Sequence, residues 1–343
     1  MQRLVRTAFL WLVLLPLPVH ATTPGQPPDG TAPATPTAAA AAPPKADPQL
    51  PWVTREADAP RVSFHRFHSA VAGTTVSYHL YTPLEYDQFP DRRFPVLYWL
   101  HGTEGGINHI RPVARLFHFG IRDHGLPPLL VVFVNGLSKR LWTDSKDGRA
   151  PIESVFIRDL IPQIDQSLRT IAGPHGRILE GFSMGGYGAA RIGFQHPELF
   201  GGISILAAGP LSPEFEGPRA NGNPLRDEIL RDVCSSDMQY FRATHPWNMA
   251  QQNAARLRHT GTIIRQAVGT SDFSLALNRT YHEHLQTQQI PHEYHEVPNV
   301  AHDTPALLAG LANAQFYRKA LTPRPPAAAP AQDSQSSTAD SPQ

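Results

Sequence analysis

Short apolar runs alternate with longer amphipathic stretches through the middle of the chain. Segments 61–70 and 74–83 alternate apolar with polar residues, which is typical of antiparallel strands with one wetter face. Later runs are compact and rich in apolar and β-branched residues, which is typical of strands buried on both faces of a parallel sheet. These runs are FPVLYWL, LLVVFVN, GRILEGF, GGISILAAG, TIIRQAV and HEYHEV.

A helix is predicted between two of these runs, over residues 152–171. Apolar residues recur there at helical spacing, and Gly173 and Pro174 follow as a stop signal. The recurring residues are Val155, Leu160, Ile161, Ile164 and Leu168. The whole pattern predicts an α/β fold, with a mostly parallel central sheet, antiparallel N-terminal strands and helices on both faces.

The first residues of the chain differ from this pattern. Arginines precede an apolar run of 13 residues, and Val19-His20-Ala21 fits a cleavage site, so residues 1–21 are predicted to be a secretory signal peptide. A membrane anchor is the alternative, but about 20 apolar residues are needed to span a bilayer. Pro16 and Pro18 shorten this run further. We therefore expect a secreted or periplasmic protein with no membrane anchor in its mature form.

Two low-complexity segments flank the patterned region. Residues 22–51 are rich in Pro, Ala and Thr, and residues 322–343 are rich in Pro, Ala, Ser and Gln. Such compositions bury too little apolar surface to offset the entropy of ordering, so we expect a disordered linker and a disordered tail. Residues 52–321 are predicted to form one domain, with no internal repeat or second linker.

Composition excludes several classes of protein. At 41% hydrophobic residues the chain can build a core, and its one cysteine, Cys234, allows neither an internal disulfide nor a lipid anchor near the cleavage site. The formal net charge is +1, and removal of Arg3 and Arg6 leaves about −1 without any basic run. We therefore expect no nucleic-acid partner.

One glycine-rich turn carries candidate chemistry. The segment Gly181-Phe182-Ser183-Met184-Gly185 lies between the strand GRILEGF and a helix-forming stretch, which is the context of a nucleophile elbow. In so tight a turn, side chains at Gly181 and Gly185 would collide with neighbouring backbone. The pattern alone is weak evidence, because a glycine-rich turn with an incidental serine has the same sequence.

A serine nucleophile needs a base and an orienting acid. Asp272 lies in the turn after TIIRQAV and His302 in the turn after HEYHEV, which gives the order Ser, Asp, His expected for this fold. We predict Ser183 as nucleophile, His302 as base and Asp272 as acid. In the alternatives, Asp272 only caps a helix and His302 only decorates the surface. Asp303 is expected to start the final helix.

An oxyanion pocket should combine two backbone amides. The amide of Met184 begins the helix after the serine, and the loop HGTEGG after FPVLYWL should supply the other, from Thr103. Glu104 is a second option, and a merely flexible turn is the alternative.

Several segments together resemble the putative esterase family of α/β-hydrolases, which includes esterase D-like enzymes, feruloyl and acetyl-xylan esterases and the mycolyltransferase antigens. They are YTPLEY, RRFPVLYWLHG, LWTDS, IESVFIRDLIPQID and GFSMGGYGAARIGFQHPELFGGISILAAG. The resemblance implies an α/β-hydrolase fold, and it implies the same nucleophile, base, acid and oxyanion amides that the residues indicate.

The same resemblance extends to a substrate pocket. LWTDS is similar to a pocket-side loop in the family, so Trp142 and Asp144, together with Glu104, are candidate pocket residues. Loop packing and a local Asx turn are the alternative interpretations of Trp142 and Asp144. Residues 211–240 are expected to form an irregular insertion of the kind that builds acyl or alcohol pockets.

Metal chemistry is the obvious rival because the chain has 17 histidines. His282 and His284 are two apart on an expected helix, and His292 and His295 are three apart on an expected strand, so each pair should point to different faces. We therefore expect no metal and no cofactor. Asn278-Arg279-Thr280 forms a glycosylation sequon, a pattern common by chance.

Three functions are compatible with these residues. The first is a serine carboxylesterase acting on a small-molecule or carbohydrate-linked ester. The second is an acyltransferase that passes the same acyl group to a sugar or alcohol, and the third is a non-catalytic binding module. The type of ester and the oligomeric state stay open.

Overall fold

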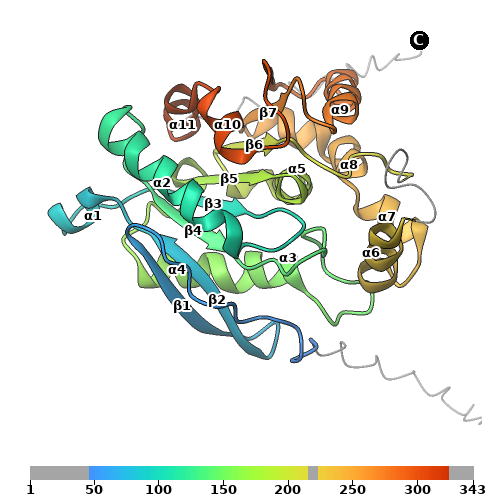
Figure 1. Ribbon diagram of the computed structural model, residues 1–343, viewed down its shortest axis with the longest axis horizontal. Coiled ribbons are helices and arrows are strands. Elements are labelled where there is room, and N and C mark those ends of the chain that lie inside the picture. Colours follow the sequence, from blue (N-terminus) through green and yellow to red (C-terminus); the bar gives the residue numbers. More distant parts are fainter. Residues whose placement is uncertain (1–45, 215–222, 324–343) are drawn as a thin grey trace, which may run out of the picture. The chain divides into compact units, whose positions relative to one another are not determined.

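A single sheet organises the part of the chain that the computed structural model describes, residues 46–214 and 223–323 (Figure 1). Its eight strands run in the order β1-β2-β4-β3-β5-β6-β7-β8. β1 and β2 pair antiparallel, β2 pairs antiparallel with β4, and the remaining pairs are parallel. The strands are β1 (Val62–Ser69), β2 (Thr74–Tyr81), β3 (Val96–Leu100), β4 (Leu130–Val134), β5 (Arg177–Phe182), β6 (Gly202–Leu206), β7 (Ile263–Gly269) and β8 (Glu293–Val297). The predicted fold class is confirmed.

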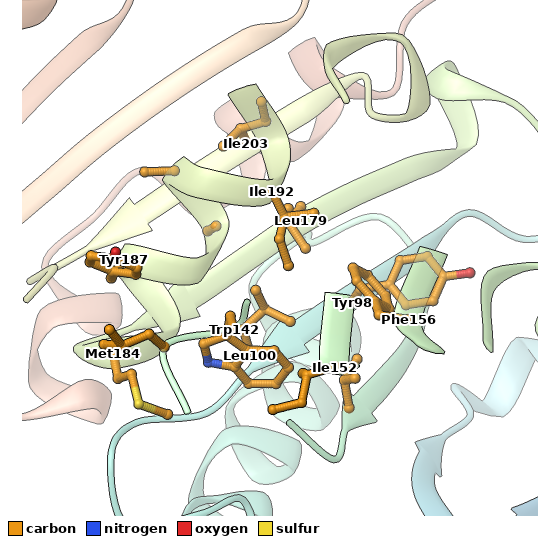
Figure 2. Close-up of a cluster of buried hydrophobic side chains, with 14 of the residues drawn as sticks. Tyr98, Leu100, Trp142, Ile152, Phe156, Leu179, Met184, Tyr187, Ile192 and Ile203 are labelled. Carbon is orange, nitrogen blue, oxygen red and sulfur yellow. The ribbon is translucent and has the colours of Figure 1, made fainter. Parts of the chain in front are cut away.

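Side chains of the central strands alternate between two apolar cores, one on each face of the sheet. In β3, Leu97 and Trp99 point into one core, while Tyr98 and Leu100 point into the other. α2 (Ile107–Asp123), α10 (Thr304–Ala309) and α11 (Asn313–Ala320) cover the face of Leu97. α5 (Met184–Gln195), α8 (Pro246–His259) and α9 (Leu275–Thr287) cover the opposite face. Figure 2 shows part of the core beneath α5.

The helix predicted over residues 152–171 is shorter than expected. It runs through α3 (Ile152–Ser154), a π-helical stretch η1 (Val155–Leu160) and α4 (Ile161–Ser167). Beyond it the backbone turns extended, because the amide of Phe94 donates to Arg169 O and the amide of Ile171 donates to Phe94 O. The helix therefore ends before the predicted stop at Gly173 and Pro174, because residues 169–171 pair with Phe94 instead.

The insertion at 211–240 is not irregular in its described part, so that expectation was wrong. It contains α6 (Pro224–Cys234) and the start of α7 (Met238–Thr244). The side chain of Asn223 caps α6 and that of Asp237 caps α7, each accepting two backbone N–H bonds. An Asn-Pro pair is a typical helix start, and the sequence analysis overlooked it.

Ion pairs fix this insertion to the loop that follows β4. Lys139 Nζ lies 2.8 Å from a carboxylate oxygen of Glu228, and Lys146 pairs with Asp237. The backbone amide of Lys146 also donates to Val233 O at 2.8 Å. The short elements α1 (Leu84–Gln88), η2 (Pro174–Gly176) and η3 (Pro197–Leu199) complete the described chain.

The described fold begins at Ala46, before the predicted domain boundary at residue 52. Ala46 is buried, and the amide of Asp47 donates to Arg149 O at 2.8 Å. The predicted signal peptide, most of the linker and most of the tail lie outside the described residues. Within residues 46–214 and 223–323, no helix combines the length and the apolar character needed to cross a membrane.

Candidate active site

Ser183 occupies the sharp turn between β5 and α5. Its backbone has φ 60° and ψ −120°, a conformation that a non-glycine residue adopts only under constraint from its surroundings. A Cβ added to Gly185 would lie 1.9 Å from Leu100 O, and one added to Gly181 would lie 2.2 Å from Gly185 O. The predicted need for glycine on both sides of this serine is therefore confirmed.

Three side chains that are far apart in the sequence meet at this turn. His302 Nε2 lies 2.9 Å from Ser183 Oγ, and His302 Nδ1 lies 2.8 Å from Asp272 Oδ2. Asp272 follows β7 and His302 follows β8, so all three stand at the carboxyl ends of parallel strands. The Asp272 side chain is fully buried, while 23% of the His302 side chain stays exposed. The arrangement could pass a proton from the serine hydroxyl to the imidazole.

Ser274 holds the other oxygen of the carboxylate. Its amide and its hydroxyl both donate to Asp272 Oδ1 at 2.8 Å, and Asn278 Nδ2 donates to Ser274 Oγ at 3.1 Å. Burial raises the pKa of Asp272, but the bonds from His302 and Ser274 outweigh burial and bring the pKa below its usual value. The sequence analysis missed Ser274, although a serine two residues after an aspartate fits a local side-chain turn.

Two phenylalanine rings flank the imidazole of His302. Its centroid lies 4.6 Å from that of Phe182 and 4.4 Å from that of Phe273. Phe273 is 66% exposed, so its ring stands at the surface beside the histidine. The sequence offered one signal for this contact, an aromatic residue directly after the candidate acid.

The HGTEGG loop between β3 and α2 also lies against the serine. A Cβ on Gly102 would lie 3.6 Å from Ser183 Cβ. Thr103 is half-buried and its carbonyl accepts from the amide of Lys139 at 2.9 Å, while Glu104 is exposed. Met184 is the first residue of α5, so its amide has no acceptor within the helix.

The buried imidazole of His101 holds the HGTEGG loop in place through two hydrogen bonds. Its Nδ1 donates to Gly102 O at 2.8 Å, and its Nε2 accepts from the amide of Gly136 at 3.1 Å. Burial lowers the pKa of His101 to about 4, so the imidazole is neutral at pH 7 and these two bonds assign the proton to Nδ1. Because Gly102 O and the Thr103 amide belong to one planar trans peptide, the bond to Gly102 O also sets the direction of that amide.

Trp142 and Asp144 support the loops rather than present free side chains. Trp142 lies in the apolar cluster of Figure 2 and is fully buried. Its indole nitrogen donates to His101 O at 3.1 Å. Asp144 accepts from the amide and the hydroxyl of Ser154 at 3.0 and 2.6 Å. For Trp142 this is the loop packing considered as the alternative, while Asp144 binds Ser154, the last residue of α3, instead of making a local turn.

Asp303 accepts from the amide of Ala306 at 2.8 Å and caps α10, as expected of a residue that starts a helix, although α11 follows. Asn278 of the sequon is buried and donates to Ala208 O at 3.0 Å, so its amide is inaccessible in this fold.

Two of the histidines considered in the sequence analysis lie against each other, one from each of the two segments. His282 Nδ1 lies 2.7 Å from His292 Nε2, across from α9 to the residue before β8. Among the described residues, no group of three or more His, Cys, Asp or Glu side chains is arranged to hold a metal ion.

Comparison with protein families gives one match, to the family described as "Putative esterase", over residues 69–323. This span includes the serine turn, both of its side-chain partners and the HGTEGG loop. The chain belongs to this esterase family.

The curated relatives include proteins named as esterases. An esterase from Mycobacterium tuberculosis, Esterase Rv1288, is 28% identical over 271 residues, which cover 72% of this chain and 57% of that protein. An endo-1,4-beta-xylanase/feruloyl esterase from Xylanibacter ruminicola is 32% identical over 165 residues, 45% of this chain and 22% of that protein. The chain therefore spans little more than half the length of the mycobacterial relative.

Solved structures share the fold of this esterase family member. A ferulic acid esterase from Anaeromyces mucronatus superposes with a TM-score of 0.53 at 19% identity, covering 81% of this chain and 100% of the other. An S-formylglutathione hydrolase from Staphylococcus aureus gives 0.57 at 15% identity, covering 76% and 98%. At such identities the likeness establishes the fold, which is α/β-hydrolase-like.

Proposed function

We propose that this chain is a serine carboxylesterase that works through an acyl-enzyme on Ser183. The observation that carries the proposal is the continuous hydrogen-bonded path from Ser183 Oγ through the His302 imidazole to Asp272, at 2.9 and 2.8 Å. Membership of the esterase family and the esterases among its relatives support ester cleavage as the reaction.

Each of the three residues has one task in the reaction. Neutral His302 Nε2 takes the proton of Ser183 Oγ as that oxygen attacks the ester carbonyl carbon, and the carbonyl π electrons move to its oxygen. Asp272 accepts from Nδ1–H, which fixes the tautomer and stabilises the imidazolium. When the tetrahedral intermediate collapses, Nε2 returns the proton to the departing alcohol oxygen. Water then repeats the cycle on the acyl-enzyme and releases the free acid and the serine.

The negative oxygen of the intermediate requires donors that are already in place. The Met184 amide at the start of α5 and the Thr103 amide on the HGTEGG loop are the proposed donors. The partial positive charge of the helix N-terminus favours the same position for the oxyanion. His101 holds the peptide that carries the Thr103 amide through Gly102 O, and Lys139 holds the next peptide through Thr103 O.

The serine mechanism is tested by covalent labelling. Purified protein should hydrolyse short-chain nitrophenyl esters and react with a fluorophosphonate, and peptide mass spectrometry should place the adduct on Ser183. The Ser183→Ala variant should neither turn over nor label. Ester hydrolysis with an adduct on another residue, or no adduct at all, would refute the assignment.

We also propose that the protein is exported and acts on a small-molecule or carbohydrate-linked ester. The basic and apolar N-terminal segment with its Val19-His20-Ala21 site supports export. Edman or mass-spectrometric sequencing of protein recovered outside the cytoplasm should begin at Thr22. Recovery of protein with an intact N-terminus in the cytoplasm would contradict export. It would leave the proposal of ester cleavage by Ser183 unaffected.

A further inference from the structure

A cavity lies away from the serine, between α2, α10 and α11. It is a groove of about 890 Å³, within the size range of small-molecule sites. Its lining begins at Pro112 on α2 and at Pro305 on α10, and includes none of the residues proposed to act in ester cleavage. The groove is therefore separate from the candidate active site and is not used by the proposed mechanism.

Apolar side chains make up most of the groove wall. Leu116 and Phe119 contribute from α2, and Leu308 and Ala309 contribute from α10. Leu308 is buried, whereas Ala309 is exposed. An elongated apolar group would find a continuous surface between the helices, where burial removes its area from water.

The ionised side chains of the groove all carry positive charge. They are Arg115 and Arg318, and none of the lining residues is Asp or Glu. Within the described residues neither Arg115 nor Arg318 forms an ion pair with a carboxylate: Arg115 lies 5.8 Å from the centroid of Phe119, and Arg318 donates to Gly125 O. The other two arginines of α2 are paired, Arg111 with Asp58 and Arg122 with Asp123.

An apolar groove edged by guanidinium groups without carboxylate partners favours a ligand that is apolar along its length and anionic at one end. Arginine prefers planar oxyanions such as carboxylates, which it can bind through two parallel N–H bonds. We propose that this groove binds a free long-chain carboxylic acid, with its alkyl chain between the helices and its carboxylate at Arg115 or Arg318. The acid is taken up in monomeric form from solution, and its binding does not depend on the esterase reaction.

Other occupants fit less well. An inorganic anion would leave the apolar wall in water, and a neutral lipid would leave the guanidinium groups without an anionic partner. A second copy of the chain, docked through the same face, would bring no carboxylate to these arginines, because the groove contains none.

A fluorescent fatty acid tests the proposal directly. Titration of the full chain with dansyl-labelled undecanoic acid should give saturable binding that palmitate displaces and that hexadecanol displaces poorly. Changing Arg115→Glu and Arg318→Glu together should weaken binding about tenfold or more, since each could supply a charge-assisted bond. Ala309→Trp should weaken binding of the probe, because the larger side chain would fill the groove. The matched control is Arg66→Glu, an exposed arginine on β1 outside the groove, which should leave affinity unchanged.

Each contrary result names another occupant and overturns the proposal. Unchanged affinity in both groove variants, with loss in Phe273→Ala, would place the acid beside His302. Binding to phosphatidylglycerol vesicles without binding of the soluble probe would make the face a membrane contact. A dimer in sedimentation that the groove variants dissolve would make it an interface between copies.

Discussion

The indole nitrogen of Trp142 donates a hydrogen bond to the carbonyl oxygen of His101, and the two atoms lie 3.1 Å apart. The two rings also pack with centroids 4.7 Å apart. On its other side the indole abuts α5 so closely that a Cβ on Gly188 would lie 2.4 Å from it. One buried side chain thus braces both the helix that begins at Met184 and the loop that carries Thr103, the two proposed sources of oxyanion donors.

Replacing Trp142 with phenylalanine should therefore affect catalysis as well as stability. The variant keeps most of the apolar packing but leaves His101 O buried without its donor, which should lower the free energy of unfolding by about 1–3 kcal/mol. The turnover number should also fall, because the Thr103 peptide loses part of its support. Urea unfolding and nitrophenyl ester kinetics measure the two effects.

Trp247→Phe is the matched control for that experiment. The indole nitrogen of Trp247 is buried but has no hydrogen-bond partner, so its removal breaks no bond. Both stability and turnover should change little. A drop in Trp142→Phe no larger than that in Trp247→Phe would show that the bond to His101 is irrelevant.

The roles of the two neighbouring carboxylates can be separated by amide substitutions. Asp272→Asn should lower turnover by about four orders of magnitude, because an amide favours the wrong tautomer of His302. Asp303→Asn should remain active, since asparagine also caps a helix and Asp303 only caps α10. The two variants are compared by steady-state kinetics, with folding checked by circular dichroism. If Asp272→Asn were fully active and Asp303→Asn inactive, Asp303 rather than Asp272 would be the acid that orients His302.

Stability should decline as the pH falls from neutrality toward 4. Burial lowers the pKa of His101 to about 4 and that of His245 to about 3. The unfolded chain takes up protons near the ordinary histidine pKa, whereas the folded protein resists them, so this stability is present above pH 6.5 and is lost on acidification. His101 alone should account for roughly 3 kcal/mol between pH 7 and pH 4.

Unfolding free energies measured in urea across this pH range test the effect. His101→Gln should be less stable at pH 7 but should show a flatter dependence on pH. His175→Gln, at an exposed position, should follow the wild-type curve. An unchanged slope in His101→Gln would contradict the burial argument.

The sequence predicted the sheet and the elbow because both depend on local patterns. Continuous apolar runs mark doubly covered strands, and the glycines beside Ser183 are required by backbone contacts that the motif itself implies. For Trp142 the sequence left a pocket role and loop packing both open, because its bond to His101 joins segments 41 residues apart. Helix 152–171 was predicted too long for a similar reason: pairing of residues 169 and 171 with Phe94 overrode the local helical pattern.

Buried charge illustrates the same limit of sequence reasoning. Arg265 of β7 and Glu180 of β5 lie within apolar runs, where the pattern gives no reason for a charge. Their side chains are 1% and 0% exposed and form an ion pair at 2.8 Å. Tyr317 on α11 donates to Glu180 at 2.9 Å, so the pair also ties that helix to the sheet.

Removing one member of this pair should destabilise the protein strongly. Arg265→Met leaves the Glu180 carboxylate buried without its cation, at an expected loss of about 3–5 kcal/mol. The double variant with Glu180→Met should recover much of that loss, because no charge is then left unpaired. Guanidinium unfolding of the two single variants and the double variant gives the coupling energy. Purely additive losses would show that the charges do not depend on each other.

The N-terminal segment before Trp52 should be needed for full stability. The indole nitrogen of Trp52 donates to Asp47 O at 2.9 Å, and Ser77 N donates to Trp52 O at 2.9 Å, so the segment is bonded to β2. A chain that begins at Ala46 keeps these bonds, whereas one that begins at Trp52 leaves the buried indole without its acceptor. The shorter chain should lose about 1–3 kcal/mol of unfolding free energy, with little change in turnover on a soluble ester. Trp52→Phe separates this cause from a general effect of shortening: it should destabilise the chain that begins at Ala46 more than the chain that begins at Trp52. Equal losses in the two backgrounds would show that the bond to Asp47 O contributes nothing, and that residue 52 is an adequate start for the domain.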